Sequence, residues 1–221
     1  MKRINSLLPI GKVNFPFSKN ININMMPFII GDKTSIPIDY RHYYPLIEKC
    51  YRDENEMGKI GYLSITESLV KKGTSQRRPF IHTEKTSMGP WGGGWGKGKF
   101  EDTNTIGGIY MASNIDNSCR AWNIHIEDTG QLGNCEHFKH LLENEYILKK
   151  NELVWMTDSC PHESLPLYED TYRQWFRFVT SNVSVWYKEH STTNSLGILP
   201  NCEIIRGSKF ESQKEFTVLS F

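Results

Sequence analysis

The chain has 221 residues, enough for one domain with a sizeable buried core that needs no disulfide or metal to stabilise it. Lys and Arg total 26 against 25 for Asp and Glu, and the formal net charge of +1 argues against a strongly basic nucleic-acid binder and against an acidic-tail protein. Aromatic residues make up 12% of the chain, which favours a β-rich core over a coiled coil.

The five cysteines are an odd number at irregular spacing, without a Cys-x-x-Cys pair, so neither a disulfide framework nor a zinc ribbon is indicated. The first residues are basic, but the apolar run that follows them is too short for a signal peptide. No stretch approaches the roughly 20 apolar residues of a membrane-spanning helix. We therefore expect a soluble, cytoplasmic protein without a membrane partner, and the sequence leaves its oligomeric state open.

Residues 1–26 are predicted to be a flexible N-terminal arm, because two prolines and the polar run at 18–24 show no helical periodicity. Residues 27–221 are predicted to form a single domain. Within it, apolar residues that share one face favour a helix over 44–52. Apolar and β-branched content predicts strands over 61–66 and 76–84.

From Ile106 onward the pattern is strongly β. Strands are predicted over 106–112, 121–126, 153–156, 172–180 and 183–187, separated by turns rich in Asn, Asp and Ser, with one amphipathic helix over 135–145. Many short strands with few helices favour a mainly β protein with a jelly-roll or cupin-like barrel.

The first candidate site is His82-Thr83-Glu84. On a strand the side-chain period is two, so His82 and Glu84 project from the same face, where an imidazole and a carboxylate can bind one divalent metal. A pair that faces solvent is the alternative for this tripeptide on its own.

The second candidate lies 80 residues further on, where His162 follows the predicted strand 153–156 between two prolines. The chain then turns at 168–170 and returns as a strand that alternation divides into two faces. Arg173, Trp175 and Arg177 share one face, and Tyr172, Gln174, Phe176 and Phe178 share the other. The spacing of 11 residues between His162 and Arg173 suits one β-hairpin, which would bring the two side chains together.

Two histidines and one carboxylate on one face of an octahedral ion leave three positions open, as in non-haem Fe(II) oxygenases. An arginine beyond the third ligand can form a bidentate pair with the carboxylate of a co-substrate.

The motifs His82-Thr83-Glu84, Pro161-His162-Glu163-Ser164-Leu165-Pro166-Leu167 and Tyr172-Arg173 together resemble the Fe(II)/2-oxoglutarate-dependent dioxygenases, in their prolyl-hydroxylase-like branch. The likeness covers residues 60–188. It implies a double-stranded β-helix in which His82, Glu84 and His162 ligate Fe(II) and Arg173 binds the distal carboxylate of 2-oxoglutarate. It also implies hydroxylation of a substrate that the sequence does not identify. Glu84 in place of the commoner Asp, and the glycine-rich segment 92–98, depart from the family pattern.

Two other functions stay open. One is a non-catalytic jelly-roll or β-barrel protein with a structural or binding role, in which Arg173 pairs with Glu163 or Asp170. The other is a cupin-like metal enzyme that uses the same ligands without 2-oxoglutarate.

Several other residues carry weaker signals. Cys135, His137 and His140, completed by Cys119 and His125, form a possible zinc site, although an amphipathic helix explains the segment as well. Asn123, His125 and Glu127 alternate on one strand and are the fallback ligands.

Arg77 and Arg78 either steer an anion or form a solvated strand end, and we favour the solvated strand end. Trp91 and Trp95 form either a lid or a plug of the barrel.

Overall fold

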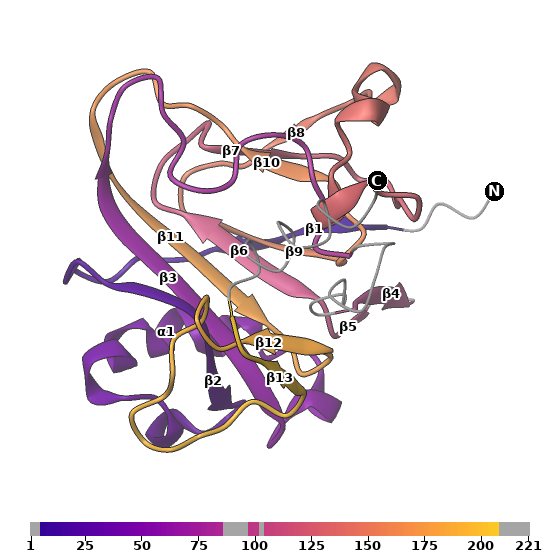
Figure 1. The fold of residues 1–221 in the computed structure, drawn as a ribbon. Coiled ribbons are helices and arrows are strands. Elements are labelled where there is room, and N and C mark those ends of the chain that lie inside the picture. The colour runs from indigo at the N-terminus through magenta and orange to yellow at the C-terminus, as the bar shows by residue number, and fades with distance from the viewer. Residues whose placement is uncertain (1–4, 86–96, 102–103, 208–221) are drawn as a thin grey trace.

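The computed structural model describes residues 5–85, 97–101 and 104–207, and its centre is a six-stranded antiparallel sheet (Figure 1). The strand order is β1-β9-β6-β11-β3-β2. The strands are β1 (Leu7–Lys12), β2 (Asn22–Ile29), β3 (Ile60–Val70), β6 (Ile109–Ser113), β9 (Glu152–Met156) and β11 (Thr171–Val179).

A smaller sheet in the order β10-β7-β8 packs against one face of the large one. Its strands are β10 (His162–Ser164), β7 (Cys119–Ala121) and β8 (Tyr146–Ile147). Two further strand pairs lie at the margins: β12 (Val185–Tyr187) with β13 (Glu203–Ile205), and β4 (Lys99–Glu101) with β5 (Asn104–Ile106).

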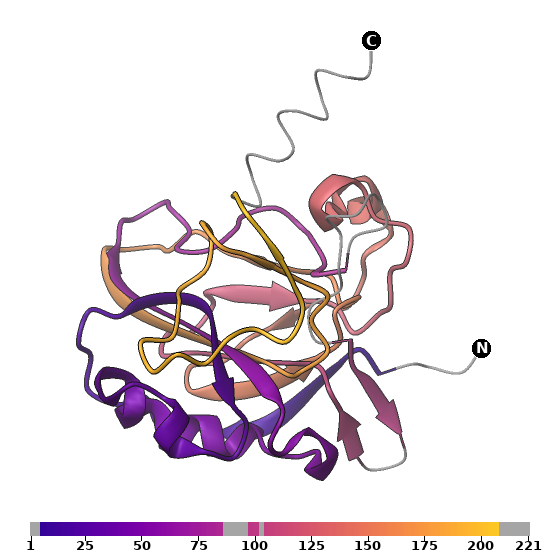
Figure 2. The same ribbon diagram turned by 60° about the horizontal axis from the view of Figure 1, so that its bottom comes forward.

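Helical segments cover the opposite face of the large sheet beside β2 and β3 (Figure 2). They are α1 (Tyr44–Ile47) and the short 3-10 helices η1 (Lys33–Ser35), η2 (Ile38–Tyr43), η3 (Glu48–Cys50) and η4 (Glu54–Glu56). Two more 3-10 helices, η5 (Gln131–Gly133) and η6 (Glu136–Leu141), lie in the connection between β7 and β8. No helix among the described residues is long and apolar enough to cross a membrane.

The core has two layers, one on each face of the large sheet. Alternation along β11 sends Trp175 and Val179 into the layer between the two sheets, and Phe176 and Phe178 into the layer under the helices. The predicted division of this strand into two faces is therefore confirmed.

The chain moves repeatedly from one sheet to the other. From β3 it passes through the His82 segment, which bridges to β10, then returns to β6, crosses to β7 and β8, and comes back to β9 before β10 and β11. This is a double-stranded β-helix, as the family resemblance implied, and the predicted mainly β class is confirmed.

The predicted flexible arm over residues 1–26 is wrong for the described part of that segment. β1 pairs with β9 and β2 pairs with β3, so both strands belong to the central sheet. Their hydrogen-bond partners are distant in sequence, which is why local periodicity gave no sign of them. Pro9 is tolerated in β1 because this strand is at the edge of the sheet.

The two predicted helices are present but less regular than expected. The segment 44–52 is one turn of α-helix followed by the 3-10 helix η3, and the segment 135–145 contains only the 3-10 helix η6. The predicted strand over 121–126 is wrong except at its first residue, because β7 spans Cys119–Ala121 and residues 122–126 are not a strand.

Candidate metal centre

His82 and His162 lie opposite each other on neighbouring extended segments. The backbone N–H of His82 donates to the carbonyl of His162 at 3.0 Å, and the N–H of His162 donates to the carbonyl of His82 at 2.9 Å. Residues that exchange both hydrogen bonds in this way direct their side chains to the same face. The pairing therefore explains why two imidazoles 80 positions apart in the sequence meet.

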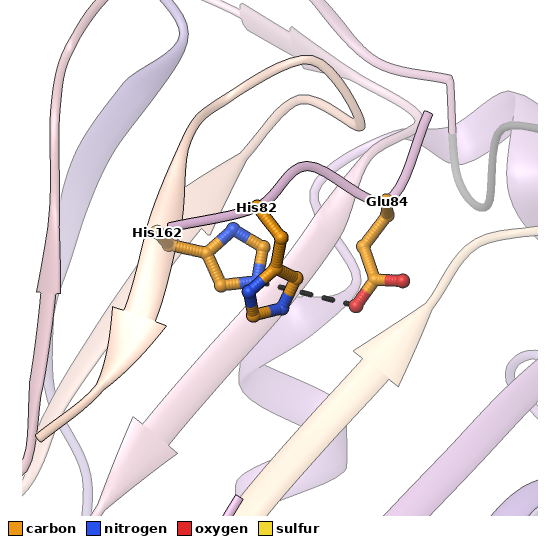
Figure 3. A group of neighbouring side chains, drawn as sticks. All are labelled: His82, Glu84 and His162. Atoms are coloured by element: carbon orange, nitrogen blue, oxygen red, sulfur yellow. Dashed lines mark ion pairs between the residues drawn. The ribbon is translucent and has the colours of Figure 1, made fainter. Parts of the chain in front are cut away.

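Glu84 completes the group, and all three side chains point toward one another (Figure 3). The imidazole ring centroids are 4.5 Å apart, and Nε2 of His162 lies 4.0 Å from Oε1 of Glu84. The three ligand atoms all lie within 4.8 Å of one another. Two metal–ligand bonds of about 2.1 Å each can span the distance between His162 and Glu84, so a single ion fits this group.

Backbone carbonyls orient both imidazoles. Nδ1 of His82 lies 2.8 Å from the carbonyl oxygen of Phe80, and Nδ1 of His162 lies 2.9 Å from that of Cys160. Since a carbonyl oxygen only accepts, each Nδ1 carries the proton and each Nε2 presents a lone pair. Phe80 adopts a left-handed conformation with φ of 70°, which interrupts the extended backbone just before His82.

Burial keeps the two imidazoles neutral. It lowers the pKa of His82 well below its usual value, and the neighbouring His162 adds to this effect. Burial likewise lowers the pKa of His162. Neutral imidazoles and an ionised carboxylate are the protonation states that a metal ion requires.

The donor set of two imidazole nitrogens and one carboxylate oxygen suits a divalent transition metal. Within the described ranges no fourth His, Cys, Asp or Glu joins the group, so coordination positions stay open to small molecules. The extra methylene of Glu84, compared with the commoner Asp, is accommodated. Its Oε1 accepts a hydrogen bond of 2.6 Å from Nη1 of Arg177 on β11.

The three residues face a cavity of about 90 Å³ between the two sheets. Its lining comes from both sheets and from the segments that connect them: Asn24, Arg77, Arg78, His82, Glu84, Ile109, Met111, Cys119, Met156, His162, Glu163, Ser164, Trp175, Arg177 and His190. This space is several times that needed by a single water molecule.

Arg173 is completely buried directly behind this cavity. Its guanidinium donates to Oγ of Ser164 at 3.0 Å and to Sγ of Cys119 at 3.1 Å, and both of these residues line the cavity. A third bond goes to Oγ of Ser113. No carboxylate in the described part of the chain pairs with Arg173.

The alternative in which Arg173 pairs with Glu163 or Asp170 is therefore wrong. Glu163 forms its ion pair with Arg120, and Asp170 forms its ion pair with Lys71.

The predicted hairpin between His162 and Arg173 is also wrong. β10 pairs with β7, and β11 lies between β3 and β6, so the two residues belong to different sheets. They are brought near each other because the sheets face one another, and Ser164 forms the link. The predicted strand 76–84 is an extended segment with isolated bridges at His82, because its partners come from loops as well as from β10.

The other candidate ligands lie elsewhere. Asn123, His125 and Glu127 are exposed, and the Asn123 side chain accepts hydrogen bonds from the backbone of Ser6 and Leu7. The proposed zinc ligands around Cys135 form no metal-binding group within the residues that the structure covers. Trp91, Trp95 and most of the glycine-rich segment lie outside the described residues.

Sequence reasoning missed three features of the site. Arg177 pairs with Glu84, and Arg77 and Arg78 line the cavity instead of forming a solvated strand end. The position of Arg177 on the same face of β11 as Arg173 was a signal for the first of these. No local pattern distinguishes a half-buried Arg77 that lines a cavity from an exposed one.

No family model matches the chain, and no curated protein matches it. Among solved structures, it is similar to HygX from Streptomyces hygroscopicus with nickel and 2-oxoglutarate bound, with a TM-score of 0.44 and 9% identity over 69% of this chain and 71% of that chain. For HygX with iron bound the TM-score is 0.43 and the identity 11%, over 79% of this chain and 82% of that chain. Both TM-scores are below 0.5.

Proposed function

We propose that this protein is an Fe(II)- and 2-oxoglutarate-dependent oxygenase that hydroxylates a substrate C–H bond. One observation carries the proposal: a buried His82, Glu84 and His162 group faces a cavity, and Arg173 lies behind the wall of that same cavity without a carboxylate partner among the described residues. A keto acid with a distal carboxylate needs a metal ion at its chelating end and a cation at its carboxylate end. The three ligand residues and Arg173 would supply these two groups.

The ligand group has one task in this proposal. His82, Glu84 and His162 hold the metal through three positions and leave the others open for the keto acid and dioxygen. Bound Fe(II) and 2-oxoglutarate supply an oxidation in which O₂ and the keto acid become succinate and CO₂ while a substrate C–H becomes C–OH. The sheets on both sides of the cavity exclude bulk water from this chemistry.

Arg173 has the second task. A fully buried guanidinium is costly unless an anion compensates it. Its three hydrogen bonds go to two hydroxyls and a thiol, which leaves two of its five N–H groups for a ligand. The distal carboxylate of 2-oxoglutarate is the anion that we assign to these two N–H groups.

The test is anaerobic addition of Fe(II) and then 2-oxoglutarate to the full chain. We expect the weak visible charge-transfer band of the metal–keto acid chelate, and succinate release once O₂ and a substrate are supplied. A non-catalytic barrel gives no band. A metal enzyme that does not use 2-oxoglutarate gives metal binding without the band or succinate. Either outcome contradicts the proposal.

A further inference from the structure

More arginines than carboxylates line the cavity beside the metal group, so its lining has a net positive charge. Its two lining carboxylates are already paired, Glu84 with Arg177 and Glu163 with Arg120. Arg77 and Arg78 line the same cavity, and neither forms an ion pair within the described ranges.

Arg77 is held against the central sheet. Its guanidinium carbon lies 4.2 Å from the ring centroid of Trp175, a cation–π contact, and its Nη1 donates to Oγ1 of Thr66 at 3.3 Å. These contacts fix the orientation of the guanidinium but do not neutralise it. The remaining N–H groups of Arg77 can bind an oxyanion in the cavity.

Arg78 is held beside the metal ligands. Its backbone carbonyl accepts from the N–H of Ser164, and its Nη1 donates to the carbonyl of Leu132 at 2.7 Å. This second guanidinium therefore borders the cavity from the segment that leads into His82, and its hydrogen-bond partner in the described part of the chain is a neutral carbonyl.

The surroundings disfavour the charge of both arginines. Burial, followed by repulsion from Arg177, lowers the pKa of Arg77 to about 10. Burial also lowers the pKa of Arg78. A bound anion would remove this penalty, since it supplies the missing counter-charge.

One molecule of 2-oxoglutarate does not balance this charge. Arg77, Arg78 and Arg173 together with a divalent ion carry more positive charge than the two negative charges of the keto acid. We infer that the substrate of the proposed oxygenase is itself an anion, with a carboxylate or phosphate group that Arg77 and Arg78 bind. This inference rests on the proposed function for the role of the ligand as substrate, whereas binding of the anion can be tested without metal.

The test uses methylphosphonate and acetate as small probes of the two oxyanion types, titrated calorimetrically at constant ionic strength. The full chain is studied first without metal and then anaerobically with Fe(II) and saturating 2-oxoglutarate. We expect saturable binding of at least one probe under both conditions, which identifies the preferred oxyanion. Arg77→Gln and Arg78→Gln should each weaken binding by about tenfold or more. Arg77→Lys, which keeps the charge and the aliphatic stem, should weaken it less.

Arg52→Gln is the matched control, because it removes the same charge from an exposed position outside the cavity and should leave binding unchanged. Thermal unfolding of each variant shows whether it is folded at the temperature of the titration. Failure of both probes to bind, binding unaffected by either arginine substitution, or simple competition between the probe and 2-oxoglutarate would overturn the inference. The chelate band reports separately on the proposed function, so its absence with intact probe binding contradicts only that proposal.

Discussion

Arg177 on β11 and Glu84 beside His82 form an ion pair with 2.6 Å between Nη1 and Oε1, and the two side chains are only 7% and 8% exposed. The oxygen that accepts from Arg177 is the same one that lies 4.0 Å from Nε2 of His162. Arg177 therefore orients the carboxylate toward the histidines and also competes with a metal ion for one of its oxygens.

Arg177→Ala should destabilise the metal-free protein by about 3 kcal/mol or more, because it removes the ion pair that Arg177 forms with the buried Glu84 carboxylate. A metal ion replaces the lost counter-charge, so the rise in Tm on adding Fe(II) should be larger for the variant than for the wild type. Thermal unfolding with and without metal measures both effects. Lys71→Ala, which breaks the exposed pair with Asp170, serves as the control and should change neither. If Fe(II) raises the Tm of Arg177→Ala and of the wild type equally, Arg177 does not act on the metal site through Glu84.

His162→Ala should lower the affinity for Fe(II) by about 100-fold or more, since one of three protein ligands is lost. The fold should persist, because the pairing of residues 82 and 162 uses only backbone groups. Anaerobic titration calorimetry measures the affinity, and His125→Ala, at an exposed position, is the control. An unchanged affinity in the His162 variant would refute the assignment of the ligands.

Arg173→Ala should weaken 2-oxoglutarate binding by about 2–5 kcal/mol, while metal affinity changes much less. The reason is that truncation removes the guanidinium that donates to both Ser164 and Cys119 in the cavity wall. The affinity for 2-oxoglutarate is measured from the intensity of the chelate band as the 2-oxoglutarate concentration is raised. A larger loss of 2-oxoglutarate affinity in Arg177→Ala would show instead that the co-substrate is bound one strand repeat nearer the metal group.

The stability of the metal-free protein should fall as pH decreases below about 6.5. Burial lowers the pKa of His82 and His162 in the folded state, so the unfolded chain binds protons first as pH falls through the ordinary histidine value of 6.5. Above that pH both states are deprotonated, and this contribution to stability is fully present. Urea unfolding from about pH 8 to about pH 5 measures the slope, which His162→Ala should reduce. A pH-independent free energy of unfolding in that range would contradict the buried, neutral state of the two imidazoles.

Glu67→Ala should cost about 3 kcal/mol of stability, because several buried donors lose their acceptor at once. The Glu67 carboxylate accepts from Tyr43 Oη at 2.6 Å, from Gln174 Nε2 at 2.9 Å and from the backbone N–H groups of Lys19 and Ile21 at 2.8 and 2.9 Å. These bonds attach the segment before β2 to the central sheet. Urea unfolding measures the loss in the free energy of unfolding. The control is Glu48→Ala, at an exposed position. A loss no greater than that of the control would mean that this attachment contributes nothing to stability.

The sequence by itself determined the features that depend on local spacing. The period of two along residues 172–178 placed Arg173, Trp175 and Arg177 on one face, and the fold keeps that division because alternation is a property of any strand. The residue types at 82, 84 and 162 likewise indicated a metal group, since few combinations of side chains suit a divalent ion. The abundance of short strands was sufficient for the mainly β class.

Only the tertiary structure decided which strands pair and which arginines are buried. β1 and β2 become strands because β9 and β3 supply hydrogen-bond partners more than thirty positions away, and residues 1–26 contain no pattern that reports those partners. β10 pairs with β7 and not with the following β11 for the same reason. Arg77 and Arg78 look like a solvated pair in the sequence, yet packing of the two sheets places both at the cavity. Burial depends on neighbours that folding brings together, and charge alone does not reveal them.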